Sequence, residues 1–311
     1  MKSQSSVKRK IKTVTSIQKV TKATAAIANI RLQALSSPLL ALKPYQENLA
    51  KSVDNISRHL DRDVLGSAVP FFRKTRTSKV LFIIFSSDKG LCGGYNSRLL
   101  SEVAEATRSQ IRLGRKLSFI SFGRHACEYL TRMKRTIIRS YPAVCLSAAA
   151  DLARELTKDC SSMVASKDVD EIHVFYNRFL SAGRQQAQSS LFLPLDLSGI
   201  PSGRKSPDIS DEDGIMEATP AGKYTIADFE IDGIPAETLL PLYFHHLEIS
   251  MRRIILESAA GEQAARMSAM QESTSNADDL IKDLSMKYNK MRQAHITGEL
   301  IEVVSSAEAL N

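Results

Sequence analysis

The chain has 311 residues, of which 43% are hydrophobic and 6% aromatic, and its formal net charge at pH 7 is +8. This length suggests about two structural units. Four cysteines without CxxC spacing exclude a disulfide scaffold and indicate reduced thiols. The longest uninterrupted apolar run, Val80–Phe85, is far shorter than the ~20 residues of a membrane helix, so no membrane span is predicted.

Residues 1–62 predict one long N-terminal helix. Neither proline nor glycine occurs from Met1 to Ser37, whereas Pro38 and Pro44 predict a kink or a local break. Apolar or small residues recur at alternating spacings of four and three, which is the pattern of a coiled-coil seam. The seam positions are Val7, Ile11, Val14, Gln18, Thr21, Ala25, Ala28, Leu32 and Leu35.

The same segment is strongly basic. Its first acidic residue is Glu47, which follows nine lysines and arginines. Such one-sided charge predicts an acidic partner, which could be a protein, a phosphate backbone or anionic lipid. Residues 1–44 contain no Phe, Tyr or Trp, so the aromatic groups that stack on bases are missing and an acidic protein loop fits better. A solvated polar face is the simpler alternative.

Residues 78–197 predict an α/β domain. The apolar run Lys79–Ser86 is typical of a buried parallel strand. Strand and helix patterns then alternate, which predicts a mostly parallel sheet flanked by helices. The predicted strands cover residues 79–86, 117–122, 171–179 and 190–195, and the predicted helices cover residues 96–113, 124–133 and 148–166.

Residues 198–232 predict a loop or linker. Seven glycines and prolines lie between residues 198 and 222, together with an acidic cluster. The members of this cluster are Asp208, Asp211, Glu212 and Asp213.

Residues 233–311 predict a second long helix that begins near Pro235. It has two seam series displaced by one residue, a correction that a straight helix of 3.6 residues per turn needs to keep one face toward a partner. The first series is Ala277, Ile281, Leu284, Tyr288 and Met291, and the second is Ile296, Leu300, Val303, Ala307 and Leu310.

The predicted fold is therefore a long antiparallel coiled coil of the N- and C-terminal helices plus a central Rossmann-like α/β domain. A helix of about 50 residues is a rod of about 75 Å, because each residue adds ~1.5 Å. Such a rod extends well beyond a small domain, which favours a mechanical or scaffolding protein over an enzyme with a pocket.

The candidate chemical motifs have simpler structural interpretations. The glycine-rich segment Gly90–Gly94 lacks both the Lys-Ser/Thr ending of a phosphate loop and the dinucleotide GxGxxG, so a tight backbone turn is favoured. Cys92 could be a nucleophile, but no local histidine supports it and a packing thiol is favoured. His245-His246 and Asp211–Asp213 lack zinc and calcium ligand patterns. The sequence thus predicts no catalytic residue, metal site or cofactor.

Six motifs in order along the chain resemble the gamma subunit of F-type ATP synthases. The similarity covers nearly the whole chain and is strongest from Glu257 to Leu310 and at Gly90–Gly94. The motifs are Ile17–Ala23, Pro44-Tyr45, Ser87–Gly94, Glu262–Met267, Tyr288–Ala294 and Ile296–Val304.

The resemblance implies a non-catalytic rotor, one copy per complex, in the central stalk of a proton-translocating ATP synthase. Rotation of a membrane c-ring would drive conformational change and ATP synthesis in the beta subunits. The implied partners are the alpha and beta subunits of the hexamer, a small stalk subunit of epsilon or delta type, and the c-ring, with no nucleic acid. The implied location is peripheral to the mitochondrial inner membrane on its matrix side, or alternatively the cytoplasmic face of a bacterial plasma membrane.

The resemblance also assigns subunit-interface residues. One set matches family positions that hydrogen-bond to catch loops of the beta subunit, and a second set matches a basic face directed at acidic beta-subunit levers. The first set is Arg292, Gln293 and Thr297, and the second is Arg9, Lys19 and Lys22.

The chain departs from the family pattern at several positions. Thr24 stands where methionine is common, Lys89 replaces a common arginine, and Glu308 places a carboxylate in an alanine-rich tip. Residues 161–311 contain no cysteine, so the paired-cysteine insert of chloroplast gamma subunits has no counterpart.

Two alternatives belong to other functional classes. The basic coiled coil could be a scaffold that binds nucleic acid, and the α/β domain could carry a small-molecule enzyme.

Overall fold

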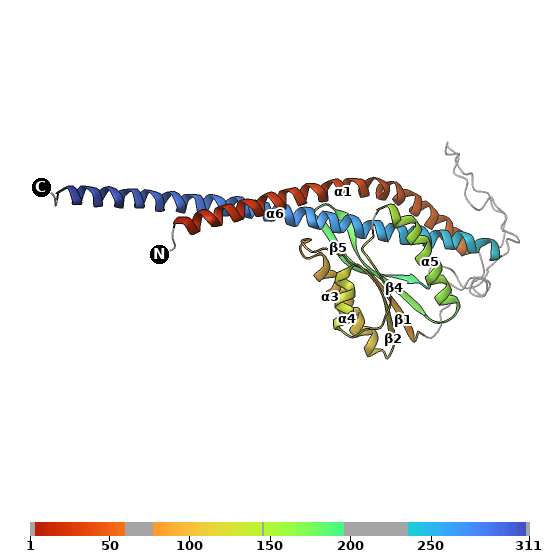
Figure 1. Ribbon diagram of the computed structural model, residues 1–311. Helices are drawn as coiled ribbons and strands as arrows, with labels where there is room; N and C mark the ends of the chain where they lie inside the picture. Colours follow the sequence, from red (N-terminus) through yellow and green to blue (C-terminus); the bar gives the residue numbers. More distant parts are fainter. Residues whose placement is uncertain (1–3, 60–76, 145, 196–235, 309–311) are drawn as a thin grey trace, which may run out of the picture.

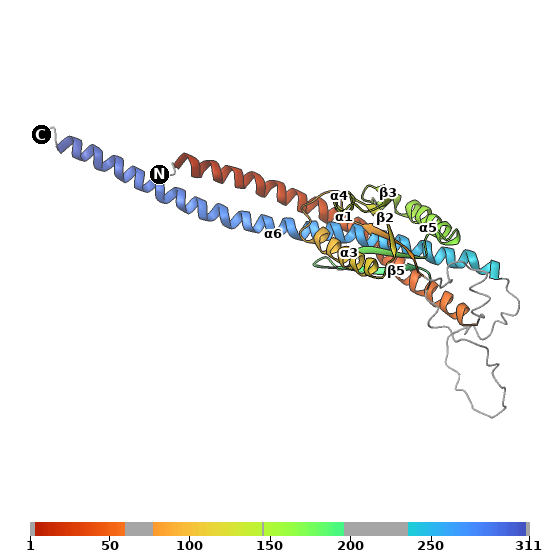
Figure 2. The same cartoon turned by 90° about the horizontal axis from the view of Figure 1, so that it is seen from below.

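The computed structural model describes residues 4–59, 77–144, 146–195 and 236–308. Two long helices, α1 (Gln4–His59) and α6 (Ala236–Glu308), lie side by side and antiparallel, with both chain termini toward the same free end (Figure 1). We call this helix pair the shaft. The α/β domain, which we call the foot, packs on the shaft away from that free end, and Figure 2 shows the same arrangement from below.

The helix α1 is continuous through Pro38 and Pro44. The predicted local break is therefore absent, and the helix instead arches over the foot (Figure 1). The reason is tertiary packing, since Leu42 and Val53, close to and beyond the two prolines, are buried in the same core as α6 and the sheet. This burial holds the segment helical despite the lost backbone hydrogen bonds.

The coiled-coil seam predicted for α1 is confirmed. All nine seam residues are buried or half-buried, and the small residues Ala25 and Ala28 allow close helix approach. Polar pairs across the helices fix the antiparallel register. They are Gln18 with Asp278, Thr21 with Thr274 at 2.7 Å, Tyr45 with His245 at 2.7 Å, and Gln46 with Ser250 at 3.1 Å.

The expectation about membrane spans needs a correction. By length and composition alone, Gln4–Val53 of α1 contains a window of mean hydropathy 1.2 that would be apolar enough to cross a membrane. Of that window, 28% is buried inside the protein. Scattered polar residues interrupt this segment, so it contains no long uninterrupted apolar run. Leu32, Leu35 and Leu42 of α1 belong to the core shared with α6, so part of this apolar content serves a helix contact.

The foot contains a five-stranded sheet in the order β3-β2-β1-β4-β5. Its strands are β1 (Lys79–Phe85), β2 (Lys116–Phe122), β3 (Ile137–Tyr141), β4 (Glu171–Ser181) and β5 (Arg184–Leu193). The pairings β1–β2, β1–β4 and β2–β3 are parallel and β4–β5 is antiparallel, which confirms the predicted mostly parallel sheet.

Helices cover both faces of the sheet. The helices α3 (Tyr95–Arg112) and α4 (Arg124–Arg132) pack on one face, where Phe82, Leu99 and Phe119 belong to one core. The helix α5 (Ala149–Ala165), preceded by the short helix η2 (Leu146–Ala148), packs on the other face together with the two shaft helices.

The second core joins foot and shaft. A single cluster of buried residues includes Leu35 of α1, Ile83 of β1, Leu156 of α5 and Ile255 of α6. The shaft helices therefore cover one face of the sheet, in the way that α3 and α4 cover the other. The foot and the shaft cannot rotate relative to each other without opening a hydrophobic core.

The predicted linker at residues 198–232 lies outside the described residues, and so do its acidic cluster and the seam residue Leu310.

Candidate functional site

The loop between β1 and α3 is a tight turn, as the sequence predicted. Leu91 and Gly93 have φ angles of 62° and 54°, in the left-handed region. A Cβ atom at Gly93 would lie 3.7 Å from the Cβ atom of Ala269 on α6. Cys92 and Tyr95, which flank the turn, form a small buried cluster with Ala265 of α6. The glycine-rich segment thus brings the backbone of the foot against the shaft.

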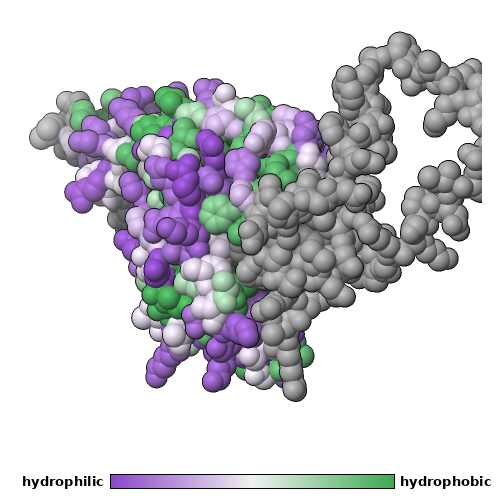
Figure 3. Space-filling model, turned by 90° about the vertical axis from the view of Figure 1, so that its right-hand side faces the viewer, coloured by the Kyte–Doolittle hydropathy of each residue, from purple (hydrophilic) through white to green (hydrophobic). Residues whose placement is uncertain are grey.

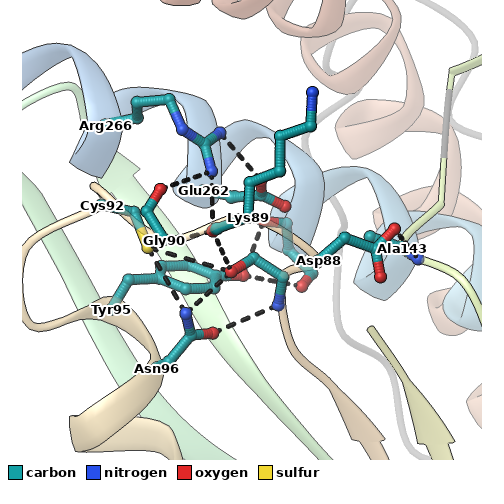
Figure 4. Close-up of polar contacts among 11 residues, drawn as sticks. Asp88, Lys89, Gly90, Cys92, Tyr95, Asn96, Ala143, Glu262 and Arg266 are labelled. Carbon is teal, nitrogen blue, oxygen red and sulfur yellow. Dashed lines mark hydrogen bonds and ion pairs between the residues drawn. The ribbon is translucent and has the colours of Figure 1, made fainter. Parts of the chain in front are cut away.

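Arg266 of α6 fastens this loop to the shaft (Figure 4). Its guanidinium donates hydrogen bonds to the carbonyl oxygens of Lys89 at 3.1 Å and Gly90 at 3.4 Å, and pairs with Glu262 at 2.8 Å. Burial raises the pKa of the Glu262 carboxyl, and the neighbouring Arg266 offsets part of that shift. Charge-assisted bonds in such a poorly solvated place are strong and directional.

Tyr95 forms a second polar fastening. Its hydroxyl donates to the carbonyl oxygen of Ser258 on α6 at 2.8 Å, and its own backbone carbonyl accepts from the Asn177 amide at 3.3 Å. Burial raises the pKa of the Tyr95 phenol, which therefore stays protonated and able to donate. We call Arg266, Glu262, Tyr95 and Ser258 the foot-to-shaft joint.

Asp88 braces the loop from the foot side. Its carboxylate accepts hydrogen bonds from the backbone N–H groups of Arg124 at 3.0 Å and Ala143 at 2.9 Å, which follow β2 and β3. Gly123 has a φ of 83° and lies so close to Ser86 that a Cβ atom would meet its carbonyl oxygen at 2.4 Å. The ends of three parallel strands are therefore locked together beneath the joint.

A cleft of about 720 Å³ opens beside the joint. Its lining includes Ile27 and Arg31 of α1, Leu91 of the loop, Val144, and Glu262 of α6. Among the residues that the structure describes, no group of three His, Cys, Asp or Glu side chains could hold a metal ion.

Cys92 has the environment of a packing thiol. It is 2% exposed, and burial raises the pKa of its thiol, which keeps the less reactive protonated form at neutral pH.

The first predicted interface set lies on the protruding end of α6. Gln18 of α1 lies beside Asp278 of α6. Because the helices are antiparallel, the same register places Gln4, the first residue of α1, level with Arg292. Arg292, Gln293 and Thr297 are exposed, and Thr297 donates to the carbonyl oxygen of Gln293 at 2.9 Å. The structure thus places these three residues close together on the unpaired part of α6, where the two-helix region ends.

The second predicted set lies on α1. Arg9, Lys19 and Lys22 are all exposed, and none forms an ion pair with any residue in the described ranges. Lys19 and Lys22 are three residues apart and share one helix face, whereas Arg9 lies more than two turns nearer the free end.

The second seam series of α6 faces solvent instead of α1. Ile296 is 48% exposed, Leu300 61% and Val303 67%. The helix α1 begins at Gln4, which is level with Arg292, so it does not cover these residues. The displaced periodicity was visible in the sequence. The sequence did not show how far α6 extends past α1. These exposed apolar side chains form a candidate binding surface that the sequence assigned to the helix pair.

The fold and these surfaces define a class of protein. It is a rigid shaft fastened to an α/β foot, and its candidate binding residues lie along the shaft. The comparisons with known proteins identify the family. A family model described as ATP synthase matches residues 3–310. The ATP synthase gamma chain of Nostoc sp. is 31% identical and that of Chlorobium chlorochromatii 34% identical, each over 98% of both chains. The chain therefore belongs to the ATP synthase gamma-chain family.

Solved structures share the fold. A chain from the mitochondrial ATP synthase of Tetrahymena thermophila, in a structure of its central stalk and c-ring, matches with a TM-score of 0.53 and 21% identity, over 81% of this chain and 98% of that one. A chain from the Euglena gracilis mitochondrial enzyme matches with a TM-score of 0.51 and 19% identity, over 93% and 95%.

Family membership confirms the function predicted from the motifs. The chain is a gamma subunit of the ATP synthase central stalk, a non-catalytic rotor subunit peripheral to the membrane. This function takes the place of the two alternatives, a nucleic-acid scaffold and a small-molecule enzyme.

Proposed function

We propose that this chain transmits torque from a proton-driven c-ring to a hexamer of alpha and beta subunits. In this proposal the foot stands on the ring beside a small subunit of epsilon or delta type, and the shaft enters the hexamer. The observation that carries the proposal is the continuous core and polar joint between foot and shaft. Torque applied to the foot would turn the shaft instead of being lost at a hinge.

The predicted segments divide this work. Residues 1–62 and 233–311 would form the shaft, residues 78–197 the foot, and residues 198–232 the connection between foot and shaft. The shaft is asymmetric, with two paired helices along the foot and a single helix, α6, at the protruding end on the left of Figure 1. An asymmetric rod presents a different surface to each of three equivalent partners, and so biases their conformational equilibria differently.

We further propose the contacts made by the two residue sets. Arg292, Gln293 and Thr297 would hydrogen-bond to loops of the beta subunits. The basic residues Arg9, Lys19 and Lys22 would face acidic beta-subunit segments. Their exposure supports this role, because an exposed ion pair contributes only ~0–1 kcal/mol and can be exchanged as the shaft turns.

For the location we propose the matrix side of the mitochondrial inner membrane, with the cytoplasmic face of a bacterial plasma membrane as the alternative. The basic isoelectric point of about 9.3 and the ending Glu299–Val304 support the former. The relatives at 31–34% identity come from bacteria, and the mitochondrial likenesses are in fold. Fractionation of the source cells, with detection of this chain in each fraction, decides between the two.

The test of the interface is the double variant Arg292→Ala/Gln293→Ala. We expect assembled enzyme to lose ATP synthesis while nucleotide affinity of isolated beta subunits stays unchanged. The matched control is Gln271→Ala/Glu272→Ala, which removes two exposed polar side chains from the paired part of α6. Unchanged synthesis in the first variant, or an equal loss in the control, would contradict the proposed contacts.

A further inference from the structure

The cleft beside the foot-to-shaft joint has the size of a small-molecule site. Its volume of about 720 Å³ lies within the range of about 300–1,000 Å³ that is usual for ligand pockets. Its walls come from α1, the loop after β1, the segment after β3 that leads into η2, and α6. The proposed transmission of torque leaves this space unused.

Apolar side chains line much of the cleft. The buried part of the lining includes Ala28 and Leu35 of α1. The exposed part includes Ile27, Leu91 and Leu146, which are 53%, 69% and 40% exposed. On the end of the molecule that Figure 3 shows, hydrophobic and hydrophilic residues are instead interspersed over the described surface. Apolar residues that gather around one cleft favour a ligand with an apolar body, whereas scattered ones are ordinary surface residues.

Leu91 is held at the cleft by a strained backbone. Its φ angle of 62° lies in the left-handed region, which is costly for a residue with a branched apolar side chain. The side chain is largely exposed, so its burial within the chain does not offset that cost. Strain of this kind is typical of ligand-binding sites. A ligand that covers Leu91 would supply the missing burial.

Two cations at the cleft are available to an anion. Arg31 and Lys89 line it, both are exposed, and neither forms an ion pair with a residue of the described ranges. The Lys89 side chain extends away from the hydrogen-bonded joint (Figure 4). The two carboxylates of the lining already have partners, since Asp88 accepts from two backbone N–H groups and Glu262 pairs with Arg266. The charge that is left for a ligand is therefore positive.

The cleft is preformed by the joint. Asp88 accepts from the Ala143 N–H at 2.9 Å, and Arg266 donates to the loop after β1 at 3.1 Å, so the walls are fixed to one another. Burial raises the pKa of the Glu262 carboxyl, and the positive charges of Arg266 and Arg31 offset part of that rise. The charge of Arg31 therefore acts inside the cleft. A preformed site loses little conformational entropy when a ligand binds.

We propose that this cleft binds a small anionic amphiphile, with its acidic group at Arg31 and Lys89 and its apolar body against Leu91. A cleft of this volume, bounded by four segments of the chain, encloses one small ligand, whereas a segment of a partner protein needs an extended groove. A ligand in this place contacts α1, α6 and two loops of the foot at once, so it stabilises the connection between foot and shaft. The proposal does not rest on the proposed shaft contacts.

Titration of the purified full chain with anilinonaphthalene sulfonate tests the site. This dye carries a sulfonate on an apolar aromatic body, and its fluorescence increases when it leaves water. We expect one saturable site per chain. Decanoate, kept below the concentration at which it forms micelles, should displace the dye. Decylammonium, which has the same chain length and the opposite charge, should be weaker by at least about tenfold, because it cannot accept from the two cations.

Two leucine variants form a matched pair for the apolar wall. Leu91→Asn removes the apolar side chain, and asparagine tolerates the left-handed backbone at this position. We expect it to weaken dye binding about fivefold or more. Leu40→Asn makes the same change at a residue of α1 that is 71% exposed and lies outside the cleft lining, and should leave dye binding unchanged.

Two double variants form a matched pair for the charges. Arg31→Gln/Lys89→Gln should weaken decanoate binding about tenfold or more and remove its preference over decylammonium. Arg108→Gln/Lys158→Gln removes the same charge from exposed positions outside the cleft lining and should preserve both. A thermal melt of each variant checks that it is folded.

Several outcomes overturn the proposal. They are the absence of a saturable dye site, equal displacement by decanoate and decylammonium, and an equal loss in either variant and its matched control. Displacement of the dye by a short peptide of leucine and glutamate, but not by decanoate, would assign the cleft to a protein partner and would also overturn it.

Discussion

The two ends of α6 are parts of one helix with opposite environments. In the part that packs on the foot, which we call the lower part, five side chains are at most 1% exposed. They are Tyr243, Leu247, Met251, Ile255 and Ala264. From residue 292 to residue 306, past the start of α1, none of the side chains is buried. The lower part is covered by α1, α5 and the sheet, whereas the protruding part extends past the end of α1 (Figure 1).

This difference separates two requirements of a shaft. Where torque enters, the helix must have a single rigid arrangement, and close packing against three neighbours provides it. Where partners are contacted in turn, the side chains must be accessible. The protruding part therefore depends on helix propensity and on its partners, because it buries no core of its own.

The largest expected contrast is between one large apolar residue from each part. Ile255→Ala should lower the free energy of unfolding by about 2–5 kcal/mol, because Ile255 is 1% exposed and its removal leaves a cavity. Leu300→Ala, at a residue 61% exposed, should change it by less than about 0.5 kcal/mol. Urea unfolding of both variants measures the difference. Similar losses would show that the protruding part is packed in the isolated chain.

The next contrast concerns ion pairs. Arg266→Ala should cost about 1–3 kcal/mol, because it leaves Glu262 and two backbone carbonyls without their donor in a poorly solvated joint. Lys282→Ala, which breaks the exposed pair with Asp279 at 3.2 Å, should cost less than about 1 kcal/mol.

Chemical denaturation measures both ion-pair variants, and proton-coupled ATP synthesis reports whether the joint still transmits torque. A stable Arg266→Ala variant with full coupling would remove the joint from the mechanism.

A buried histidine of the lower part and an exposed one of the protruding part should affect the pH dependence of stability differently. Burial lowers the pKa of His246, with a smaller contribution from His245, so the unfolded chain binds a proton more readily than the native one. Stability contributed by neutral His246 is present above its unfolded pKa, near 6.5, and is lost as the pH falls toward its folded pKa. One proton limits the slope to about 1.4 kcal/mol per pH unit.

Melting temperatures at pH 7.5 and 5.5 measure this slope. His246→Asn should flatten it, whereas His295→Asn, in the protruding part and paired only with Glu299 at 3.4 Å, should leave it as in the wild type. An identical slope in all three proteins would contradict the assignment to His246.

The smallest effect concerns the register of the shaft. Thr21 is 8% exposed and shares a hydrogen bond of 2.7 Å with Thr274 of α6. Thr21→Val should cost about 0.5–1.5 kcal/mol, while Thr13→Val, whose hydroxyl bonds only within α1, should cost less. Denaturant midpoints decide the order, and a larger loss at Thr13 would count against a role of the polar pair in register.

Local patterns predicted much of the fold. The ends of α3, α4 and α5 and the strands β1, β2 and β4 were placed within about two residues, because periodicity and glycine or proline punctuation are local properties. The edge strands were harder. β3 was not predicted, since Ile137–Tyr141 is largely exposed, and most of β5 is polar, so its pairing with β4 has no local signal. An exposed edge strand is specified by the neighbour that it pairs with.

In the candidate site, too, some features were predictable from local sequence and others were not. The motif around Gly90–Gly94 and the exposed set at Arg292 were recognisable along the chain. Glu262 and Arg266 lie in the motif Glu262–Met267, but the contact of Arg266 with the carbonyl oxygens of Lys89 and Gly90 could not be predicted from residue spacing.

By itself, the sequence determined two long helices, a seam of small and apolar residues, and an alternating α/β segment between them. Only the tertiary structure decided that α1 passes through its prolines, that α6 extends past it, and that foot and shaft share one core. The physical reason is range. Helix periodicity depends on residues three or four positions apart, whereas these three properties depend on contacts between residues that are far apart in the chain.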